Sequence, residues 1–67
     1  MKEFGERLRE QREGKNLTRA QLAKETGFTE VSVGRWEKGQ TIPDIQTLKV
    51  FTKYFGCPAG YLIGTEN

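Results

Sequence analysis

The segment that decides the fold covers residues 17–39 and reads LTRAQLAKETGFTEVSVGRWEKG. Its first helix has a clear start, because Thr18 and, three positions later, Gln21 form a capping box that satisfies free backbone N–H groups. We predict this helix over about residues 18–25. Gly27 follows it and is the residue type that adopts a left-handed turn without a steric penalty.

A second helix follows after a very short turn. Thr29 is a suitable N-cap for it, and the helix is expected to end near residues 38–39. Two short helices joined by a turn of about three residues that contains glycine are typical of a helix-turn-helix. The segment therefore predicts a helix-turn-helix whose second helix covers residues 29–38.

The apolar residues of the segment predict how its two helices cross. Ala23 is small enough to allow a close approach of the helices. The spacing of Trp36 from Val33 turns both residues inward, so we assign Trp36 to the core rather than to stacking on a base. The expected interlocking set is Leu22, Ala23, Phe28, Val33 and Trp36.

A further helix is predicted upstream of this segment. Phe4 and Leu8 recur at helical spacing, which indicates an amphipathic helix over residues 2–13 that Gly14 ends. Its alternating Glu and Arg residues form opposite-charge pairs on a solvated face. We do not interpret them as a catalytic carboxylate pair, because a single helix surface offers no cleft that would raise a carboxyl pKa.

Two more helices are predicted downstream. The first begins at Pro43 and Asp44 and stops at Gly56, and the second is short and begins at Pro58. The apolar positions of the first repeat at spacings of three and four: Ile45, Leu48, Phe51 or Thr52, and Phe55. The last helix is expected to pack back on the core through Tyr61, Leu62 and Ile63.

Composition excludes several classes of protein. The 67 residues suffice for one domain, and with one cysteine and no histidine neither an internal disulfide nor an ordinary zinc site can form. The first ten residues lack the apolar run of a secretion signal. The uncharged stretch 54–65 is too short and too rich in glycine to cross a membrane. We expect a cytoplasmic protein that uses no metal and no cofactor.

These motifs together resemble a known family. The patterns LxxxQLAxxxG and xVxRWExG within residues 17–39, and the later P-x-x-x-x-L spacing, are similar to the Cro and lambda-repressor type of helix-turn-helix domain, the xenobiotic-response-element family. The resemblance covers roughly residues 3–64. It implies an all-α fold, a compact five-helix lambda-repressor-like domain with the helix-turn-helix at its second and third helices. We expect residues 1–64 to form this DNA-binding domain and residues 65–67 to be a frayed C-terminus.

The resemblance implies that the exposed face of the second motif helix enters the major groove of DNA. Arg35 suits two hydrogen bonds to guanine O6 and N7, and Val31 offers a methyl surface to thymine. Glu30 is unusual there, because a carboxylate repels phosphate. It can accept a hydrogen bond from cytosine N4, act against binding at wrong sites, or simply favour the helix N-terminus. The expected base-reading residues are Thr29, Glu30, Val31, Ser32 and Arg35.

Contacts to phosphate are expected at both edges of this face. The N-terminus of the first motif helix presents free N–H groups, and its first residue, often glutamine in the family, is Arg19 here. By resemblance, the residues after the second helix provide the other backbone contact. The expected phosphate-binding residues are Thr18, Arg19, Lys38, Gln40 and Thr41. Residues 14–53 carry seven positive against four negative charges, a bias that favours a polyanionic partner.

Two further features concern the geometry of the motif rather than contact with DNA. By resemblance, Arg12 and Glu37 form a salt bridge between the first and third helices, which would fix the angle of the recognition helix. Gly34 departs from the pattern, because a glycine inside a helix costs about 1 kcal/mol relative to alanine. It either allows a close approach to the DNA backbone or to a neighbouring protomer, or is merely tolerated.

The predicted function is sequence-specific binding of double-stranded DNA by a transcriptional regulator, and a repressor is the first expectation. No residue pattern of an enzyme is present. A module this small needs a homodimer, at least on DNA, and a pseudo-palindromic operator. Tyr61 and Ile63, or a domain after residue 67, would make the dimer contact. The alternative is a protein-interaction module of the same fold, such as an antitoxin or coactivator, with Val31 and Tyr61 as its anchors.

Overall fold

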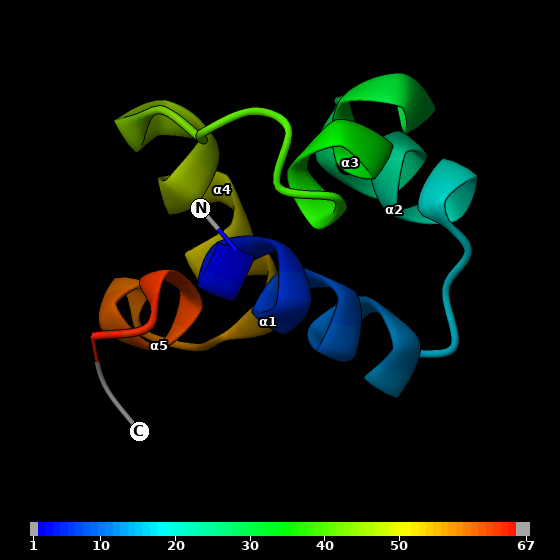
Figure 1. Ribbon diagram of the computed structural model, residues 1–67. Helices are drawn as coiled ribbons and strands as arrows, with labels where there is room; N and C mark the ends of the chain where they lie inside the picture. The colour runs from blue at the N-terminus through cyan, green and yellow to red at the C-terminus, as the bar shows by residue number, and fades with distance from the viewer. Residues whose placement is uncertain (1, 66–67) are drawn as a thin grey trace.

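The computed structural model describes residues 2–65, and within them the chain forms five helices and no strands. They are α1 (Lys2–Gly14), α2 (Arg19–Thr26), α3 (Glu30–Glu37), α4 (Ile45–Phe55) and α5 (Ala59–Ile63). In Figure 1, α2 and α3 lie together at the upper right and α4 lies opposite them, while α1 and α5 run beneath. Contacts join α1 to α3 and α5, and α4 to α2 and α5. The prediction of an all-helical fold with five helices is confirmed.

The boundaries of the helix-turn-helix follow from local signals. Thr18 Oγ1 accepts a hydrogen bond from the Gln21 N–H at 3.1 Å, and the Gln21 side chain accepts one from the Thr18 N–H at 2.8 Å. The predicted capping box is therefore present. Gly27 ends α2 with a left-handed φ of 81°, and Thr29 caps α3 through the Ser32 N–H. Because both signals act within one turn, the sequence alone predicts where α2 ends and α3 begins.

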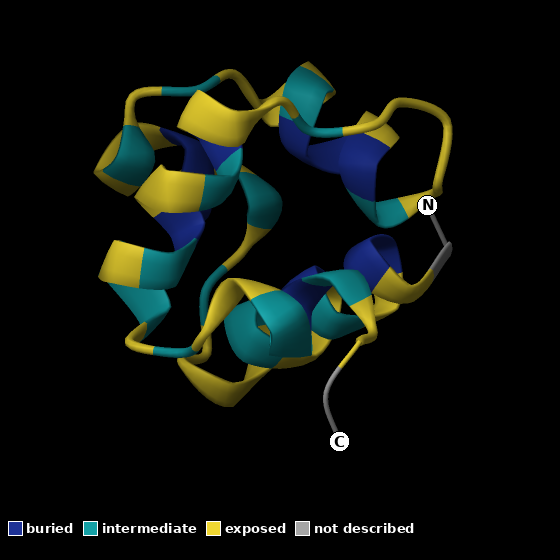
Figure 2. Cartoon of the chain, turned by 90° about the vertical axis from the view of Figure 1, so that its left-hand side faces the viewer, coloured by how far each residue is buried: buried dark blue, intermediate teal, exposed yellow. Residues whose placement is uncertain are grey.

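The core gathers apolar side chains from every helix, and buried positions face inward throughout (Figure 2). Phe51 of α4 lies at its centre, with ring centroids 5.3 Å from Phe28, 5.5 Å from Trp36 and 6.1 Å from Phe4. Such aromatic pairs stabilise a small core beyond the area they bury. The largest fully buried side chains are Phe4, Phe51, Leu8, Leu22, Leu62 and Val33. Phe28, from the predicted interlocking set, is only half-buried but packs edge-on against Trp36 at 5.0 Å.

One local boundary is confirmed and one local prediction was wrong. The helix α1 ends at Gly14 and a turn follows, as predicted, but the positive φ of 58° in this turn belongs to Asn16. Asparagine tolerates this conformation because its short polar side chain bonds locally. Ile45 does not face the core and is 65% exposed. It precedes Phe51 by six residues, which at 3.6 residues per turn places it about 120° around the helix from the buried stripe.

The described end of the chain is held by α5. The Thr65 N–H donates to the Gly60 carbonyl at 2.8 Å, so the first residue of the predicted frayed C-terminus makes a backbone hydrogen bond. Residues 66–67, the rest of that prediction, lie outside the described residues. Among the described helices, none combines the length and the apolar character needed to span a membrane.

The N-cap of α4 leads to a prediction about pH. The Thr47 N–H donates to Asp44 Oδ1 at 2.8 Å, and this hydrogen bond lowers the pKa of Asp44 below its ordinary value. A lowered pKa in the folded state adds stability that is complete above the unfolded pKa and is lost as the pH falls through the folded pKa. We expect Asp44→Asn, which keeps a capping oxygen, to lose less stability than the unchanged chain between about pH 5 and pH 2. Thermal unfolding followed across that range measures the difference, and parallel pH profiles would contradict it.

Candidate nucleic-acid interface

The exposed face of α3 carries most of the residues predicted to read bases. Glu30, Val31 and Arg35 are exposed, and Val31 is 62% exposed despite its apolar side chain. Thr29 Oγ1 accepts from the Ser32 N–H at 3.1 Å and donates to Ser32 Oγ at 3.0 Å. The Thr29 hydroxyl is therefore used within the helix cap, which leaves the Ser32 hydroxyl proton as the polar donor of this pair.

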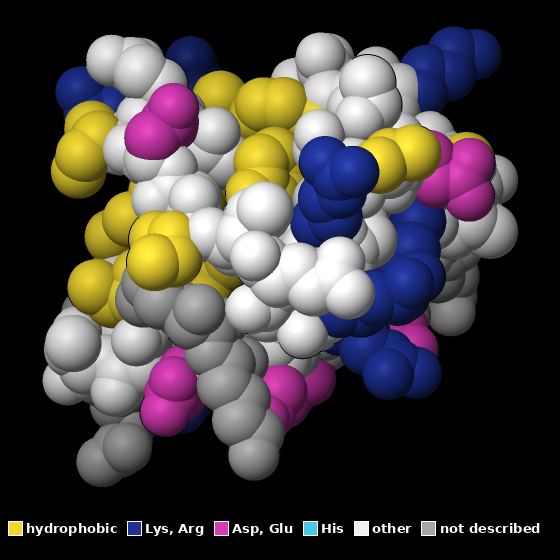
Figure 3. All heavy atoms as spheres, turned by 45° about the horizontal axis from the view of Figure 1, so that its top comes forward, with side chains coloured by type: hydrophobic (Ala, Val, Ile, Leu, Met, Phe, Trp, Pro, Cys, Tyr) yellow, Lys and Arg dark blue, Asp and Glu magenta, His cyan; other side chains and the backbone are white. Residues whose placement is uncertain are grey.

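A depression of about 310 Å³ lies beside this face, between the N-terminus of α2 and the length of α3. It brings together side chains from both predicted groups, and three of them are cationic. Figure 3 shows several Lys and Arg side chains at the right of the molecule, the side on which Figure 1 places α2 and α3. The lining residues are Arg19, Glu30, Val31, Gly34, Arg35, Lys38 and Gln40.

The remaining predicted phosphate contacts lie at the edges of this region. Thr18 is exposed at the start of α2, but its hydroxyl already accepts from the Gln21 N–H. Thr41 is exposed in the connector that leads to α4 and does not line the depression. The structure therefore groups Arg19, Lys38 and Gln40 and leaves the two threonines apart from them.

Glu37 is the carboxylate that joins α3 to α1. Arg12 donates two hydrogen bonds to Glu37, from Nε to Oε2 at 2.6 Å and from Nη2 to Oε1 at 3.1 Å. A third hydrogen bond runs from Arg12 Nη1 to the Leu17 carbonyl at 2.8 Å. The Glu37 side chain is only 1% exposed. The hydrogen bonds with Glu37 raise the pKa of Arg12 above its ordinary value, so the Arg12 guanidinium stays charged. The salt bridge implied by the resemblance is thus present and braces the end of α3.

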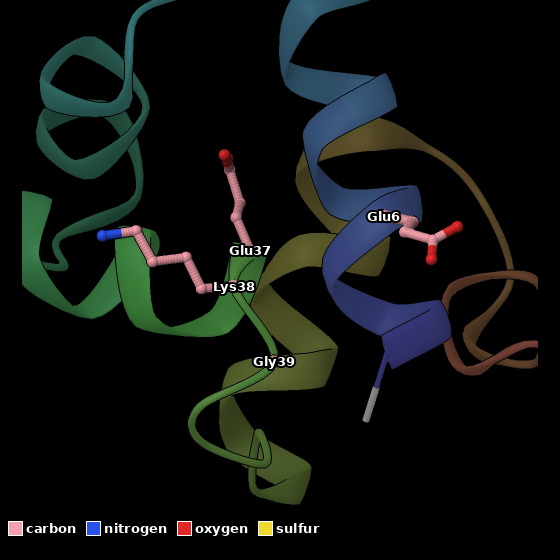
Figure 4. A pocket seen from close by; sticks show the side chains of 4 residues that line it. All are labelled: Glu6, Glu37, Lys38 and Gly39. Atoms are coloured by element: carbon pink, nitrogen blue, oxygen red, sulfur yellow. The ribbon is translucent and has the colours of Figure 1, made fainter.

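Consecutive residues at the end of α3 point in different directions. Figure 4 shows the Glu37 side chain rising between α1 and the helix-turn-helix, whereas Lys38 extends away from α1. A shallow hollow of about 420 Å³ lies between Glu6 of α1 and these residues. The end of α3 therefore supplies both a buried carboxylate, Glu37, that binds α1 and an exposed cation, Lys38.

Arg19 makes a contact that sequence reasoning missed. Its Nε donates to Glu37 Oε1 at 3.1 Å, so the same carboxylate holds arginines from α1 and α2. The Arg19 side chain lies along Gly34, where an added Cβ would be 3.6 Å from Nη1. This contact covers Gly34, which is buried although it lies on the outer side of α3. The helix-interior glycine was the available signal, but its sequence position does not say which side chain lies over it.

Of the residues expected to contact a partner, Val31 is exposed, whereas those of α5 pack back on the core, as was also expected of this helix. Tyr61 is half-buried, since the Arg7 guanidinium lies 4.5 Å from its ring centroid and Gln11 Nε2 donates to its hydroxyl at 3.5 Å. It is therefore not a free apolar anchor, and Ile63 is also half-buried. The large apolar side chains that are exposed in the described chain are Val31, Ile42, Ile45 and Val50.

The structure offers little for other chemistry within residues 2–65. No three His, Cys, Asp or Glu side chains in that range are grouped as a metal ion would require. Burial raises the pKa of the Cys57 thiol, which packs against the core. A thiol with a raised pKa forms little of the nucleophilic thiolate at neutral pH.

Comparison with known proteins points in one direction. The helix-turn-helix family pattern matches residues 8–62. The chain is 36% identical over 65 residues to the HTH-type transcriptional activator BcrR of Enterococcus faecalis, covering 97% of this chain and 32% of that protein. It is 32% identical over 60 residues to the repressor protein C2 of Salmonella phage P22, covering 90% of this chain and 28% of that protein. With the HTH-type transcriptional regulator DicA of Escherichia coli (strain K12), identity is 36% over 65 residues, with coverages of 96% and 48%.

The solved structures include a close match as well. The P22 c2 repressor protein in complex with the synthetic operator 9T superposes with a TM-score of 0.86 at 30% identity, covering 94% of this chain and 96% of that one. The chain spans less than half the length of the three curated relatives named above.

Proposed function

Because this chain belongs to the helix-turn-helix family, in its Cro and lambda-repressor type, we propose that it binds double-stranded DNA through α3 and regulates transcription as a repressor. The observation that carries the proposal is the depression beside α3, where predicted base-reading and phosphate-binding side chains meet. In this proposal residues 1–64 act as one DNA-binding domain in the cytoplasm.

Each side chain of the exposed face has a role that its chemistry suits. Arg35 donates to guanine O6 and N7, Val31 packs on a thymine methyl group, and Ser32 donates its hydroxyl proton to a base edge. Glu30 lines the same depression as the cations and accepts from cytosine N4. Thr29 contributes by capping the helix that presents them.

Phosphate contacts hold this face in register on the duplex. Arg19, Lys38 and Gln40 surround the depression and reach one strand, and the exposed Thr18 and Thr41 lie further along the backbone. Phosphate contacts carry little sequence information, so they contribute affinity more than discrimination. Two copies on a pseudo-palindromic operator, with half-sites about 34–36 Å apart, would supply the specificity that one module lacks.

Selection of bound sequences from a pool of random duplex DNA tests the proposal. We expect a two-fold symmetric consensus whose half-sites are about one helical turn apart. Binding of the selected duplex should also weaken steeply between about 50 and 200 mM salt, because several phosphates are neutralised. A pool without enrichment at low salt would contradict the proposal.

Paired alanine substitutions separate base reading from phosphate binding. Arg35→Ala is expected to remove about 1–3 kcal/mol of discrimination at one base pair of each half-site. Lys38→Ala should weaken binding to all duplexes about equally and reduce the salt slope by about one per protomer. Titration of both variants against the selected duplex and single-base substitutions of it measures the two effects. If Arg35→Ala left the base preference unchanged, the proposed groove contact would be wrong.

A second candidate function, binding of a partner protein, is favoured by the exposed apolar side chains of the connector and of α4. Ile42 is 71% exposed and Ile45 is 65% exposed. A contact made through such side chains depends weakly on salt, in contrast to binding of DNA. A salt titration of whichever complex forms therefore discriminates the two functions.

A further inference from the structure

The Arg19 guanidinium is bound to Glu37 through its Nε and is partly exposed to solvent. Of its five guanidinium N–H groups, one is used in the described structure, from Nε to Glu37 Oε1. The side chain is 33% exposed, whereas Arg12, the other arginine on Glu37, is 12% exposed. Arg12 has a second carboxylate, Glu13, at 4.0 Å, whereas Arg19 shares Glu37 with Arg12, so the two arginines on Glu37 carry more positive charge than this one carboxylate balances. Because Arg12 is the more buried of the two, that charge reaches solvent through Arg19.

The Arg19 side chain lies over Gly34 of α3, a position with room for a small side chain only. A Cβ at this position would be 3.6 Å from Arg19 Nη1 and 4.0 Å from its Cδ and Cζ, which is ordinary contact. Alanine therefore fits beneath the guanidinium, but a longer side chain must occupy the space that Arg19 fills. The same glycine lines the depression, next to Arg35 and Lys38.

We propose that Gly34 and Glu37 are positioning residues that hold the Arg19 guanidinium in one orientation, from which its outer N–H groups bind a single DNA phosphate. The inference rests on the function proposed above and names the residues that orient Arg19 for it. Glu37 fixes Nε and thereby the plane of the guanidinium, and Gly34 provides the surface on which that plane lies. A guanidinium held in this way loses little conformational freedom on binding phosphate, and its fork matches two phosphate oxygens.

A double-mutant cycle with the selected operator duplex tests the coupling. Gly34→Gln should lower affinity about tenfold in the Arg19 background, the loss of one charge-assisted hydrogen bond. In an Arg19→Gln background the same substitution should change affinity little, because the displaced contact is already absent. Gly14→Ala is the control: Gly14 does not line the depression and an added Cβ there has no neighbour within 4 Å, so this substitution should leave affinity unchanged.

Ethylation of individual phosphates gives a readout that a purely structural role would not move. In the unchanged chain, ethylation of one phosphate per half-site should interfere with binding through Arg19. That interference should vanish in Gly34→Gln and in Arg19→Lys, while the interference due to Lys38 remains. Arg19→Lys keeps the charge but cannot bond Glu37 and phosphate from one rigid fork. It therefore tests the inference independently if Gly34→Gln folds poorly.

The outcomes distinguish the inference from the proposed function. If the unchanged chain binds no duplex, both are overturned. If it binds a duplex, but Gly34→Gln weakens binding equally in both Arg19 backgrounds, or Arg19→Lys keeps the full ethylation pattern, only the positioning role is overturned. Circular dichroism of each variant at the binding temperature verifies that the compared proteins are folded.

Discussion

Replacing Glu37 by glutamine is expected to destabilise the fold by about 3–5 kcal/mol, the cost of removing one partner of a buried ion pair. Glu37 is 1% exposed and accepts hydrogen bonds from Arg12 and Arg19. Glutamine has nearly the same shape but carries no charge, and its amide group would face guanidinium donors. Arg12, itself only 12% exposed, would lose its hydrogen-bonded carboxylate and, of its ion pairs, keep only the distant one with Glu13 at 4.0 Å.

The size of this loss matters because the domain is small. A chain of this length has a total stability of roughly 3–10 kcal/mol, so much of the protein would unfold at moderate temperature. Chemical denaturation followed by Trp36 fluorescence measures the change in the free energy of unfolding. Glu13→Gln is the matched control, because Glu13 pairs with Arg9 at 3.1 Å on a surface where both side chains are more than half exposed. That control should change stability by about 0.5 kcal/mol or less. Equal effects of the two substitutions would contradict the role assigned to Glu37.

Gly5→Ala is expected to be the most damaging change of a single methyl group, costing about 3 kcal/mol or more. Gly5 is buried where α1 crosses the end of α3. A Cβ there would lie 2.5 Å from the Trp36 carbonyl oxygen and 2.6 Å from the Glu37 carbonyl oxygen. Both oxygens belong to the backbone and cannot rotate away, so the two helices would have to separate.

Such a separation of α1 from α3 would also lengthen the hydrogen bonds between Arg12 and Glu37. The Gly5 contact and the Arg12–Glu37 hydrogen bonds both connect α1 to the same end of α3. Gly14→Ala is the control on the same helix, because an added Cβ there has no neighbour within 4 Å. Thermal unfolding should show a large decrease for Gly5→Ala and no decrease for Gly14→Ala. A melting temperature unchanged by Gly5→Ala would mean that α1 approaches α3 less closely than the structure shows.

Much of the candidate interface could be predicted from the sequence, in particular which side of α3 is exposed. The inward turn of Val33 and Trp36 predicts which side of α3 is exposed, because helical periodicity relates the two faces directly. The presence of Glu30, Val31 and Arg35 on the exposed side follows from that relation.

Contacts between residues far apart in the sequence could not be predicted from helical periodicity. The resemblance implied a bond between Arg12 and Glu37, but nothing local indicated that Arg19 shares the same carboxylate. Tyr61 was expected to pack back, but nothing local indicated that Arg7 and Gln11 of α1 are the residues that contact it. In both cases the partners are at least 18 residues apart, so short-range spacing carries no information about them.

Residues 17–39 thus determine the helix-turn-helix by themselves, because caps, the left-handed Gly27 and the apolar period act within one or two turns of chain. The tertiary structure decides how that motif is held. The closeness of α1 and α3 at Gly5, the two arginines on Glu37 and the cover over Gly34 all depend on the angles at which helices cross. Those angles are set by the fit of the whole core around Phe51, to which every helix contributes, and no single segment of the sequence specifies them.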